Sequence, residues 1–206
     1  MNFKKILDYV FPTSRKLLLN ESLNRINFSF CEEVLIVGAG SDPYRKYFSK
    51  TCEYITLDIV PKKDVQLVAD AHELPVQKES FDCILATEVL EHLHDPHLFI
   101  DAAYVALKPG GILVFTVPFM FHEHADPNDY WRPTKQALEK LCYSFSLCKI
   151  QSQGNRLHVL SDLITTAFFP CPIFYPLRII NHLLIFLSET FQKTTAPSGY
   201  LVVANK

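Results

Sequence analysis

The chain has 206 residues, of which 49% are hydrophobic and 20% are charged, and its formal net charge is −2. This composition is typical of a folded globular protein and excludes an intrinsically disordered chain. Because the charge is nearly balanced, we expect no electrostatic recruitment of nucleic acid.

The six cysteines are scattered, without a CxxC pair or any metal-ligand spacing among them. We interpret them as reduced, mostly buried thiols. The first residues, MNFKKILDYVF, lack the long apolar stretch and the small-residue cleavage site of a signal peptide. Together these features predict a cytoplasmic protein.

Residues 3–26 predict short amphipathic helices interrupted near Pro12, with Thr13 or Ser14 as the N-cap of the second helix. From Glu33 onward, short apolar runs alternate with helical stretches. The runs are VLIVGAG, YITLDIV, VQLVAD, FDCILATEVL, GILVFTVPF and GYLVVANK, with a further strand expected near FSLCKIQSQ. This alternation predicts an α/β fold, a parallel sheet with helices on both faces.

A glycine turn, formed by Gly38, Ala39 and Gly40, follows the first apolar run. A strand, such a turn and a helix start allow backbone N–H groups to approach a ligand closely. Pro43 replaces the third glycine of a dinucleotide-binding GxGxxG motif, which counts against NAD or FAD. Asp58 ends the next strand, where its carboxylate can accept both hydroxyls of a ribose. These residues favour another nucleoside ligand.

Two further stretches extend this pattern: VADAHELPVQKESFDCILATEVLEHLHDP at residues 68–96 and ALKPGGILVFTVP at residues 106–118. With the glycine turn and Asp58 they make four ordered motifs. From residue 33 to residue 134 the sequence resembles the class I S-adenosylmethionine-dependent methyltransferases, specifically the methyltransferase type 11 group. The resemblance implies a Rossmann-like, seven-stranded, mostly parallel sheet with an antiparallel terminal strand.

We therefore predict a single methyltransferase domain over residues 1–206. Its expected parts are an N-terminal helical cap (1–32), a cofactor-binding core (33–156), an apolar helical insertion (157–197) and the terminal strand (198–206).

The resemblance implies S-adenosylmethionine as the cofactor. Gly38, Ala39 and Gly40 would line its methionine and ribose part, Asp58 would bind the ribose hydroxyls, and Ile59 would flank the adenine. The further cofactor-binding residues implied in this way are Asp70, Ala71, Thr87 and Glu88.

One position departs from the family pattern. The family usually has an acid two residues before the first glycine of the turn, and this chain has Ile36 there. Either Asp42 compensates for the missing acid or the affinity for the cofactor is reduced.

The polar stretch HEHADPNDYWRP, residues 122–133, follows a predicted strand, at the edge where open α/β sheets bind ligands. An acceptor hydroxyl must lose its proton, and His122 and His124 are the candidate bases. His92 would lie beside the transfer site. The HEH spacing is not the helical HExxH arrangement and has no cysteine nearby, so proton transfer is favoured over metal binding.

The same stretch offers acceptor contacts. Tyr130 and Trp131 can supply a flat stacking face, and Arg132 can grip a phosphate or carboxylate with two hydrogen bonds. HADPNDYWRPT also resembles a stretch in some methyltransferases of the same broad group, many of them tied to cell-surface glycan synthesis. The alternative is a structural loop in which Asp126, Asp129 or Thr134 caps the next helix.

Residues 157–187 are markedly apolar, but the longest charge-free run is shorter than the ~20 residues that span a bilayer. Three explanations compete: extra core helices, a homodimer interface, or a peripheral membrane contact through residues 163–187. The first two together are favoured over the third.

These observations predict methyl transfer from S-adenosylmethionine to a small-molecule or lipid-linked acceptor, with a hydroxyl favoured, as in O-methylation of glycans. One alternative is C-methylation of a quinone-like lipid ring. Another is a catalytically silent cofactor-binding or scaffold subunit. A nucleic-acid acceptor is disfavoured because the sequence has no basic stripe and no base-flipping motif.

Overall fold

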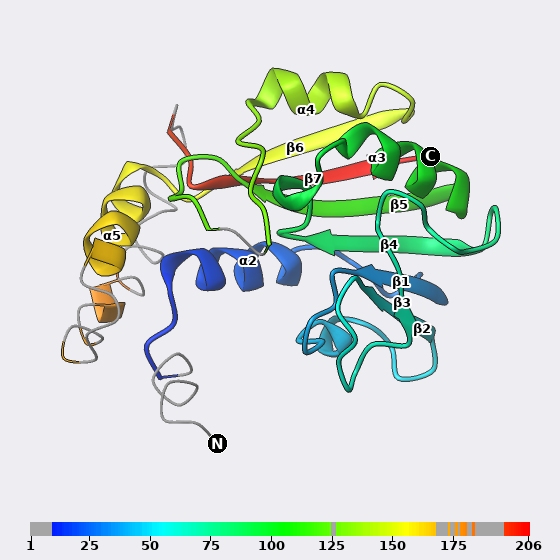
Figure 1. Cartoon of the computed structure of the whole chain (residues 1–206), viewed down its shortest axis with the longest axis horizontal. Coiled ribbons are helices and arrows are strands. Elements are labelled where there is room, and N and C mark those ends of the chain that lie inside the picture. Colours follow the sequence, from blue (N-terminus) through cyan, green and yellow to red (C-terminus); the bar gives the residue numbers. More distant parts are fainter. Residues whose placement is uncertain are drawn as a thin grey trace. The chain divides into compact units, whose positions relative to one another are not determined.

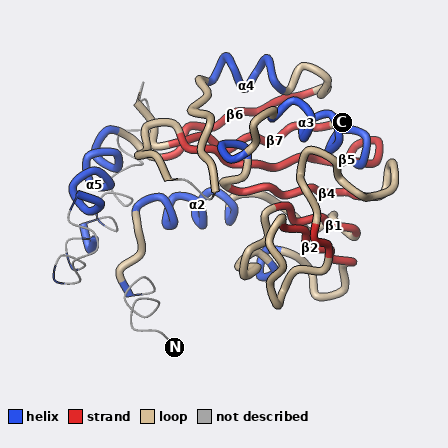
Figure 2. Tube along the Cα trace, viewed as in Figure 1, coloured by secondary structure: helices blue, strands red, loops and turns tan. Residues whose placement is uncertain are grey.

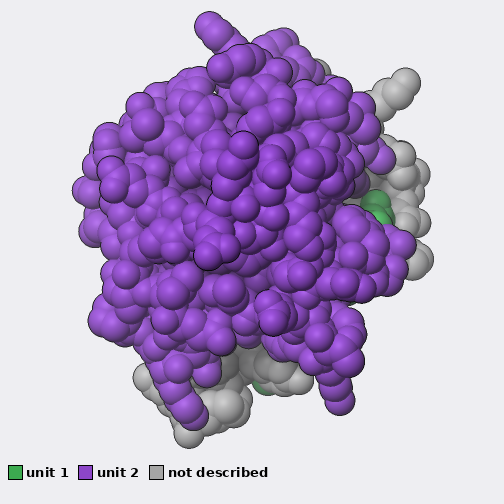
Figure 3. Space-filling model, turned by 90° about the vertical axis from the view of Figure 1, so that its right-hand side faces the viewer, with its two compact units in different colours: residues 1–25, 119–122, 152–200 green, residues 26–118, 123–151, 201–206 purple. Residues whose placement is uncertain are grey.

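The structure is a computed structural model that describes residues 10–124, 127–167, 173, 176, 178–180, 183 and 196–206. The chain divides into two compact units (Figure 3). The core unit comprises residues 26–118, 123–151 and 201–206, and the helical unit comprises residues 1–25, 119–122 and 152–200. Most of the predicted N-terminal cap and all of the predicted apolar insertion thus belong to one unit.

Seven strands form one sheet in the order β3-β2-β1-β4-β5-β7-β6 (Figure 1). Their bounds are β1 Glu33–Val37, β2 Glu53–Asp58, β3 Leu67–Val68, β4 Phe81–Thr87, β5 Leu107–Pro118, β6 Leu147–Gln153 and β7 Gly199–Asn205. The pairs β1–β2, β1–β4, β2–β3 and β4–β5 are parallel.

The terminal strand β7 runs antiparallel to its neighbours. The backbone N–H of Gly110, near the start of β5, donates to the carbonyl of Lys206 at the end of β7, and Ser146, before β6, donates to Asn205. The starts of β5 and β6 therefore lie beside the end of β7, as in antiparallel pairs. The predicted mostly parallel sheet with an antiparallel terminal strand is confirmed.

The central strands carry the core. Leu35, Ile36, Ile84 and Leu85 have no exposed surface, as expected of parallel strands that are covered on both faces. Ile36, which replaces the acid usual in the family, is fully buried. An apolar side chain suits this position, because a buried acid would need a compensating partner.

In the described part of the chain, the helices with defined bounds are α2 Ser14–Asn24, α3 Pro96–Ala106, α4 Lys135–Leu141 and α5 Arg156–Ala167, with short 3-10 turns η1 Arg45–Tyr47 and η2 Leu90–His92 (Figure 2). The Thr13 side chain accepts a hydrogen bond from the N–H of Lys16, so it is the N-cap of α2. Thr134 caps α4 in the same way. Both caps were among the predicted candidates.

A buried polar network holds the helical unit together. Arg15 on α2 donates to the side-chain oxygen of Gln153 at 2.8 Å, and the Gln153 amide donates to Ser22 on the same helix at 2.9 Å. Each polar group finds a partner, which limits the cost of burying it.

Only part of the predicted apolar insertion falls within the described residues. There α5 exposes Leu160, Leu163 and Ile164. No helix in the described part of the chain is long and apolar enough to cross a bilayer. The peripheral membrane contact and the homodimer interface remain predictions, because most of residues 168–195 lie outside the described residues.

Candidate cofactor and acceptor site

The core unit contains a cavity of about 360 Å³ at the carboxyl ends of β1, β2 and β4. This volume lies in the range of roughly 300–1,000 Å³ that is common for small-molecule sites. The predicted site residues that line it are Gly38, Gly40, Asp58, Ile59, Asp70, Ala71, Glu88, His92 and Tyr130. Residues proposed from separate motifs therefore meet around one cavity.

The glycine turn after β1 requires glycine. Gly38 and Gly40 have φ values of +68° and +58°, which side chains disfavour. A Cβ atom on Gly38 would lie only 2.4 Å from the Cγ2 atom of Val89. Ala39 between them is buried, donates its N–H to the carbonyl of Leu57 and does not line the cavity.

Asp58 at the end of β2 links the glycine turn to the strand. One carboxylate oxygen accepts the N–H of Gly40 at 2.8 Å, and the other accepts the N–H of Val60 at 2.9 Å. The Lys62 ammonium lies 3.6 Å from the first oxygen. Because a carboxylate oxygen can accept two hydrogen bonds, both oxygens keep capacity for ribose hydroxyls.

The adjoining wall combines an apolar and an acidic group. Ile59 is 59% exposed and faces the cavity. The pKa of Asp70 is lowered, first by the backbone N–H of His72 and further by the His72 ring, whose Nδ1 lies 2.6 Å from the carboxylate. An apolar face beside an ionised acceptor suits a flat ring that carries an amino group, as adenine does.

Thr87 and Glu88 follow one another at the end of β4 but face different surroundings. Thr87 is buried, hydrogen bonds to the Tyr44 hydroxyl and does not line the cavity. Glu88 has a φ of +54°, lines the cavity and accepts a hydrogen bond from Thr116 at 2.8 Å. Thr87 therefore supports the wall, whereas Glu88 forms it.

Asp42, the predicted substitute for the acid missing at Ile36, does not line the cavity. Its carboxylate accepts a hydrogen bond from the Tyr54 hydroxyl at 2.5 Å. The geometry thus gives Asp42 a structural role in the turn.

The loop after β5 is tied to the segment after β4 by three hydrogen bonds. The N–H of Tyr130 donates to the Glu91 carbonyl at 2.7 Å, and the Trp131 indole donates to the Leu93 carbonyl at 2.7 Å. The Nδ1 atom of His92 lies 2.6 Å from the carbonyl of Asn128. These bonds hold Asn128 and Tyr130 in the cavity wall.

Trp131 and Arg132 have other partners in this loop. Trp131 lines a separate apolar hollow of about 190 Å³ beside α4. The Arg132 guanidinium binds both oxygens of Asp129 and holds the pKa of that carboxyl at about 2. Neither residue lines the cavity, so Tyr130 is the predicted acceptor-binding residue of this loop that does.

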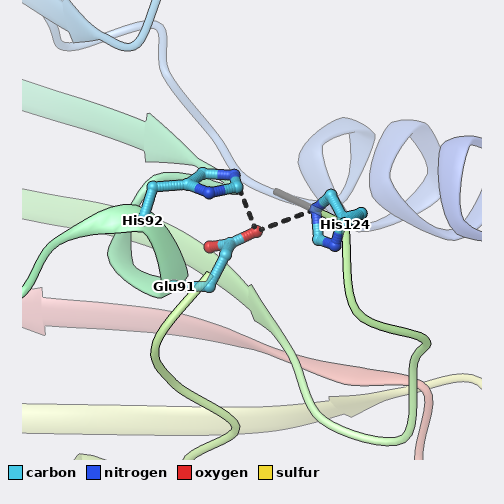
Figure 4. Close-up of side chains that lie close together, drawn as sticks. All are labelled: Glu91, His92 and His124. Atoms are coloured by element: carbon cyan, nitrogen blue, oxygen red, sulfur yellow. Dashed lines mark ion pairs between the residues drawn. The ribbon is translucent and has the colours of Figure 1, made fainter. Parts of the chain in front are cut away.

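Glu91, His92 and His124 gather in one cluster (Figure 4). Glu91 on η2 is fully buried, and its Oε1 atom lies 3.8 Å from His92 Nε2 and 3.7 Å from His124 Nε2. The two imidazole rings meet edge to face at 5.3 Å. His92 also lines the cavity, so the cluster adjoins it.

The sequence analysis did not single out Glu91. The available signal was an acid directly after the apolar run FDCILATEVL and next to His92. His122, the other candidate base, belongs to the helical unit, where its ring stacks on Phe121 at 4.2 Å. Of the two candidates, His124 is the member of the cluster in the core unit.

Comparison with known proteins bears on the family. Residues 6–153 match the family described as methyltransferase domain. The chain belongs to this family. The predicted class of S-adenosylmethionine-dependent methyltransferase is confirmed, and S-adenosylmethionine is the cofactor that it implies.

A curated relative of this methyltransferase is the mitochondrial ubiquinone biosynthesis O-methyltransferase of Rattus norvegicus. The two are 34% identical over 101 residues, which is 48% of this chain and 27% of the relative. The methyltransferase thus spans about a quarter of that protein's length.

Solved structures support the fold. A methyltransferase from Archaeoglobus fulgidus, described as S-adenosylmethionine dependent, has a TM-score of 0.62 at 18% identity, with all of both chains covered. Phosphoethanolamine N-methyltransferase 2 of Haemonchus contortus, solved with S-adenosylmethionine, has a TM-score of 0.55 at 15% identity and covers 100% of this chain and 60% of its own.

The cavity fits the cofactor of the family. Asp58 offers acceptors for two ribose hydroxyls, while Ile59 and Asp70 offer an apolar face and an acceptor for the adenine. The close approach of Val89 to Gly38 leaves the turn without room for a side chain, so its backbone faces the cavity. The assignment of individual contacts stays a prediction.

Proposed function

We propose that this methyltransferase transfers the methyl group of S-adenosylmethionine to a hydroxyl of a small-molecule or lipid-linked acceptor. One observation carries the proposal: His92, beside Glu91 and His124, lines the same cavity as the glycine turn and Asp58. A wall suited to a nucleoside and an imidazole able to assist a hydroxyl would therefore line the same cavity, which supports the proposal.

The chemistry of methyl transfer determines what the cofactor supplies and what the chain must do. When bound, the cofactor supplies a methyl group on a sulfonium centre, which needs no further activation. The chain has to align an acceptor with that methyl group and exclude competing orientations. Gly38, Gly40 and Asp58 would hold the donor, and Tyr130, which is 51% exposed, would offer a ring face to the acceptor.

The histidine cluster favours a hydroxyl over other acceptors. A neutral alcohol is a weak nucleophile and must lose its proton during transfer, which a nearby imidazole or acid can assist. The curated relative's name, an O-methyltransferase of ubiquinone biosynthesis, supports the same bond type. Hydroxylated quinone precursors and hydroxyl-bearing glycan lipids are therefore the acceptors to test first.

The test uses the full chain, methyl-labelled S-adenosylmethionine and cell extract separated into lipid and aqueous fractions. We expect label in one fraction, attached through oxygen in the isolated product. Asp58→Ala should lose cofactor binding in calorimetry. His92→Asn should keep it while turnover falls by about 100-fold or more, the usual scale of proton-transfer assistance.

His97→Asn is the matched control, because His97 lies at the start of α3 outside the cavity lining. Its turnover should equal that of the wild type. A methyl group attached through carbon would favour the quinone-ring alternative. Cofactor binding without label in either fraction would favour the scaffold alternative.

We also propose a cytoplasmic protein that contacts membrane surfaces through residues 163–187 when its acceptor is lipid-linked. The exposed apolar side chains of α5 support this. Flotation with anionic liposomes should recover the wild type, and a Leu163→Ser, Ile164→Ser double variant should be recovered less. Equal recovery would refute the contact.

A further inference from the structure

The geometry points to a divalent metal site formed by Glu91, His92 and His124. The three residues offer one carboxylate oxygen and two imidazole nitrogens, all within 4.8 Å of one another. Figure 4 shows the three side chains pointing toward one another from η2 and from the loop after β5. The site lies within the core unit.

The two distances from Glu91 to the histidines fit ligands that share an ion better than ligands that bind each other. The separations of 3.8 Å and 3.7 Å between Glu91 Oε1 and the two Nε2 atoms exceed the about 2.7–3.2 Å of an N–H···O hydrogen bond. Two ligands at about 2.1 Å from one zinc-like ion lie roughly 3.4 Å apart at a tetrahedral angle and up to about 4.2 Å apart at wider angles.

The Nδ1 atoms of the two rings face oxygen acceptors, which favours the tautomer that metal binding requires. His92 Nδ1 faces the carbonyl of Asn128 at 2.6 Å, and a carbonyl can only accept, so this nitrogen carries the proton. His124 Nδ1 lies 3.3 Å from the carboxylate of Asp129, whose two oxygens also bind the Arg132 guanidinium. In a neutral ring with the proton on Nδ1, Nε2 carries the lone pair, and the two Nε2 atoms lie 3.8 Å and 3.7 Å from Glu91 Oε1. A ligating histidine likewise binds the metal through one ring nitrogen while the other donates its proton to an oxygen.

The surrounding charge also favours a cation. Glu91 is fully buried, and Glu88 stands nearby in the cavity wall. Both act electrostatically on Arg132, whose guanidinium is bound directly to Asp129. Three carboxylates, those of Asp129, Glu91 and Glu88, thus surround this one guanidinium, and their negative potential would attract a divalent cation.

Two imidazoles and one carboxylate suit a first-row transition metal such as zinc, and oxygen-seeking Mg²⁺ or Ca²⁺ less well. Three protein ligands leave coordination positions open, as in catalytic zinc sites. From the sequence, metal binding by His122 and His124 was disfavoured because HEH is not the helical HExxH arrangement and no cysteine lies nearby. The structure brings together a different set of ligands. His124 is joined by Glu91 and His92, which lie on η2 in the connection between β4 and α3.

A metal here would place a Lewis acid beside the cavity, where it could lower the pKa of an acceptor hydroxyl. This role rests on the proposed O-methylation, whereas the binding site itself does not. His92 and His124 would then act as ligands.

Metal binding is tested on the full chain after chelator treatment and dialysis, by titration with Co²⁺ and observation of its visible absorption. We expect one Co²⁺ per chain, displaced by Zn²⁺ and retained in excess Mg²⁺. His124→Asn and His92→Asn should each weaken binding at least tenfold, with His97→Asn and Glu123→Gln as controls. Circular dichroism and cofactor affinity report the fold.

Glu91→Gln alters a buried carboxylate and can unfold the chain, so the wild type provides a second measurement. Nuclear magnetic resonance of the Co²⁺ form should show two hyperfine-shifted imidazole rings that each keep an N–H proton. Absence of stoichiometric Co²⁺ binding, unchanged affinity in both histidine variants, or displacement by Mg²⁺ would overturn the inference.

Activity separates this inference from the proposed function. Stoichiometric Co²⁺ binding without methyl transfer would support the metal site and contradict the O-methylation. Full turnover by metal-stripped protein would retain the O-methylation and overturn the Lewis-acid role. Turnover lost on stripping and restored by Zn²⁺ or Co²⁺, at constant cofactor affinity, would support both.

Discussion

At Gly38 a positive φ coincides with the close approach of the Val89 side chain. For Gly38→Ala we expect a loss of roughly 1–2 kcal/mol from the left-handed backbone and about 1–3 kcal/mol from overpacking, together with weaker cofactor binding. Gly110→Ala is the control, because Gly110 has a φ of +81° but no atom within 4 Å of the added Cβ. Urea denaturation that gives equal losses for both would contradict this explanation.

Individual residues also show where sequence reasoning stops. Gly38 and Asp58 could be placed because each sits at the end of a recognisable strand, and the ends of neighbouring parallel strands meet. Glu91 could not, because its role depends on His124 in a different connection. Arg132 was expected to bind a phosphate or carboxylate of the acceptor, and only the fold showed that its guanidinium binds Asp129.

At the level of elements, α5 carries two buried groups whose pKa values shift in opposite directions. Burial lowers the pKa of His158 to about 4 and raises that of Asp162 to about 7, the latter partly offset by Arg15 and Arg178. Between pH 4 and 6.5 the unfolded chain binds the His158 proton more strongly, so this group makes stability rise with pH. In the same pH range the folded chain keeps the Asp162 proton, which the unfolded chain releases. Asp162 therefore makes the free energy of unfolding fall as the pH rises.

The two contributions therefore oppose each other in the wild type, and single variants should expose them. His158→Gln should make the free energy of unfolding fall more with rising pH than in the wild type, and Asp162→Asn should make it rise more. Each difference is at most about 1.4 kcal/mol per pH unit. Urea denaturation from pH 4 to 6.5 measures both slopes, and slopes unchanged in either variant would show that its group does not titrate as expected.

Strand boundaries differ from the sequence expectation for identifiable reasons. Strands β1 and β4 were predictable because fully buried parallel strands have continuous apolar runs. Strand β3 contains only Leu67 and Val68 of its longer run, and Val68 is 56% exposed at the sheet edge. Strand β5 begins at Leu107, before the predicted GILVFTVPF, because Leu107 already pairs with Phe81 of β4.

For the whole molecule, the class of fold followed from the order of strands and helices. The division into two units did not, because residues 1–25 and 152–200 lie far apart in the sequence but fall in the same unit. The expected single domain stays a prediction on this point.

S-adenosylmethionine should stabilise the whole chain by linkage, by about 2.7 kcal/mol at a concentration 100 times its dissociation constant. Hydrogen exchange should slow in segments 37–40, 57–62 and 88–94, which contain much of the cavity lining. Asp58→Ala should lose both effects. Stabilisation of that variant equal to the wild type would place the cofactor elsewhere.

The three hydrogen bonds between the segment after β4 and the loop after β5 also affect how acceptor preference can be exchanged between relatives. If residues 123–133 alone were replaced by those of a relative, the carbonyls of Glu91 and Leu93 would remain as acceptors. The new loop would then have to supply donors in the positions of the Tyr130 N–H and the Trp131 indole, and a loop of different shape would not. Residues 88–95 and 123–133 therefore form one transplantable unit, and chimaeras that move both should fold where single grafts lose stability.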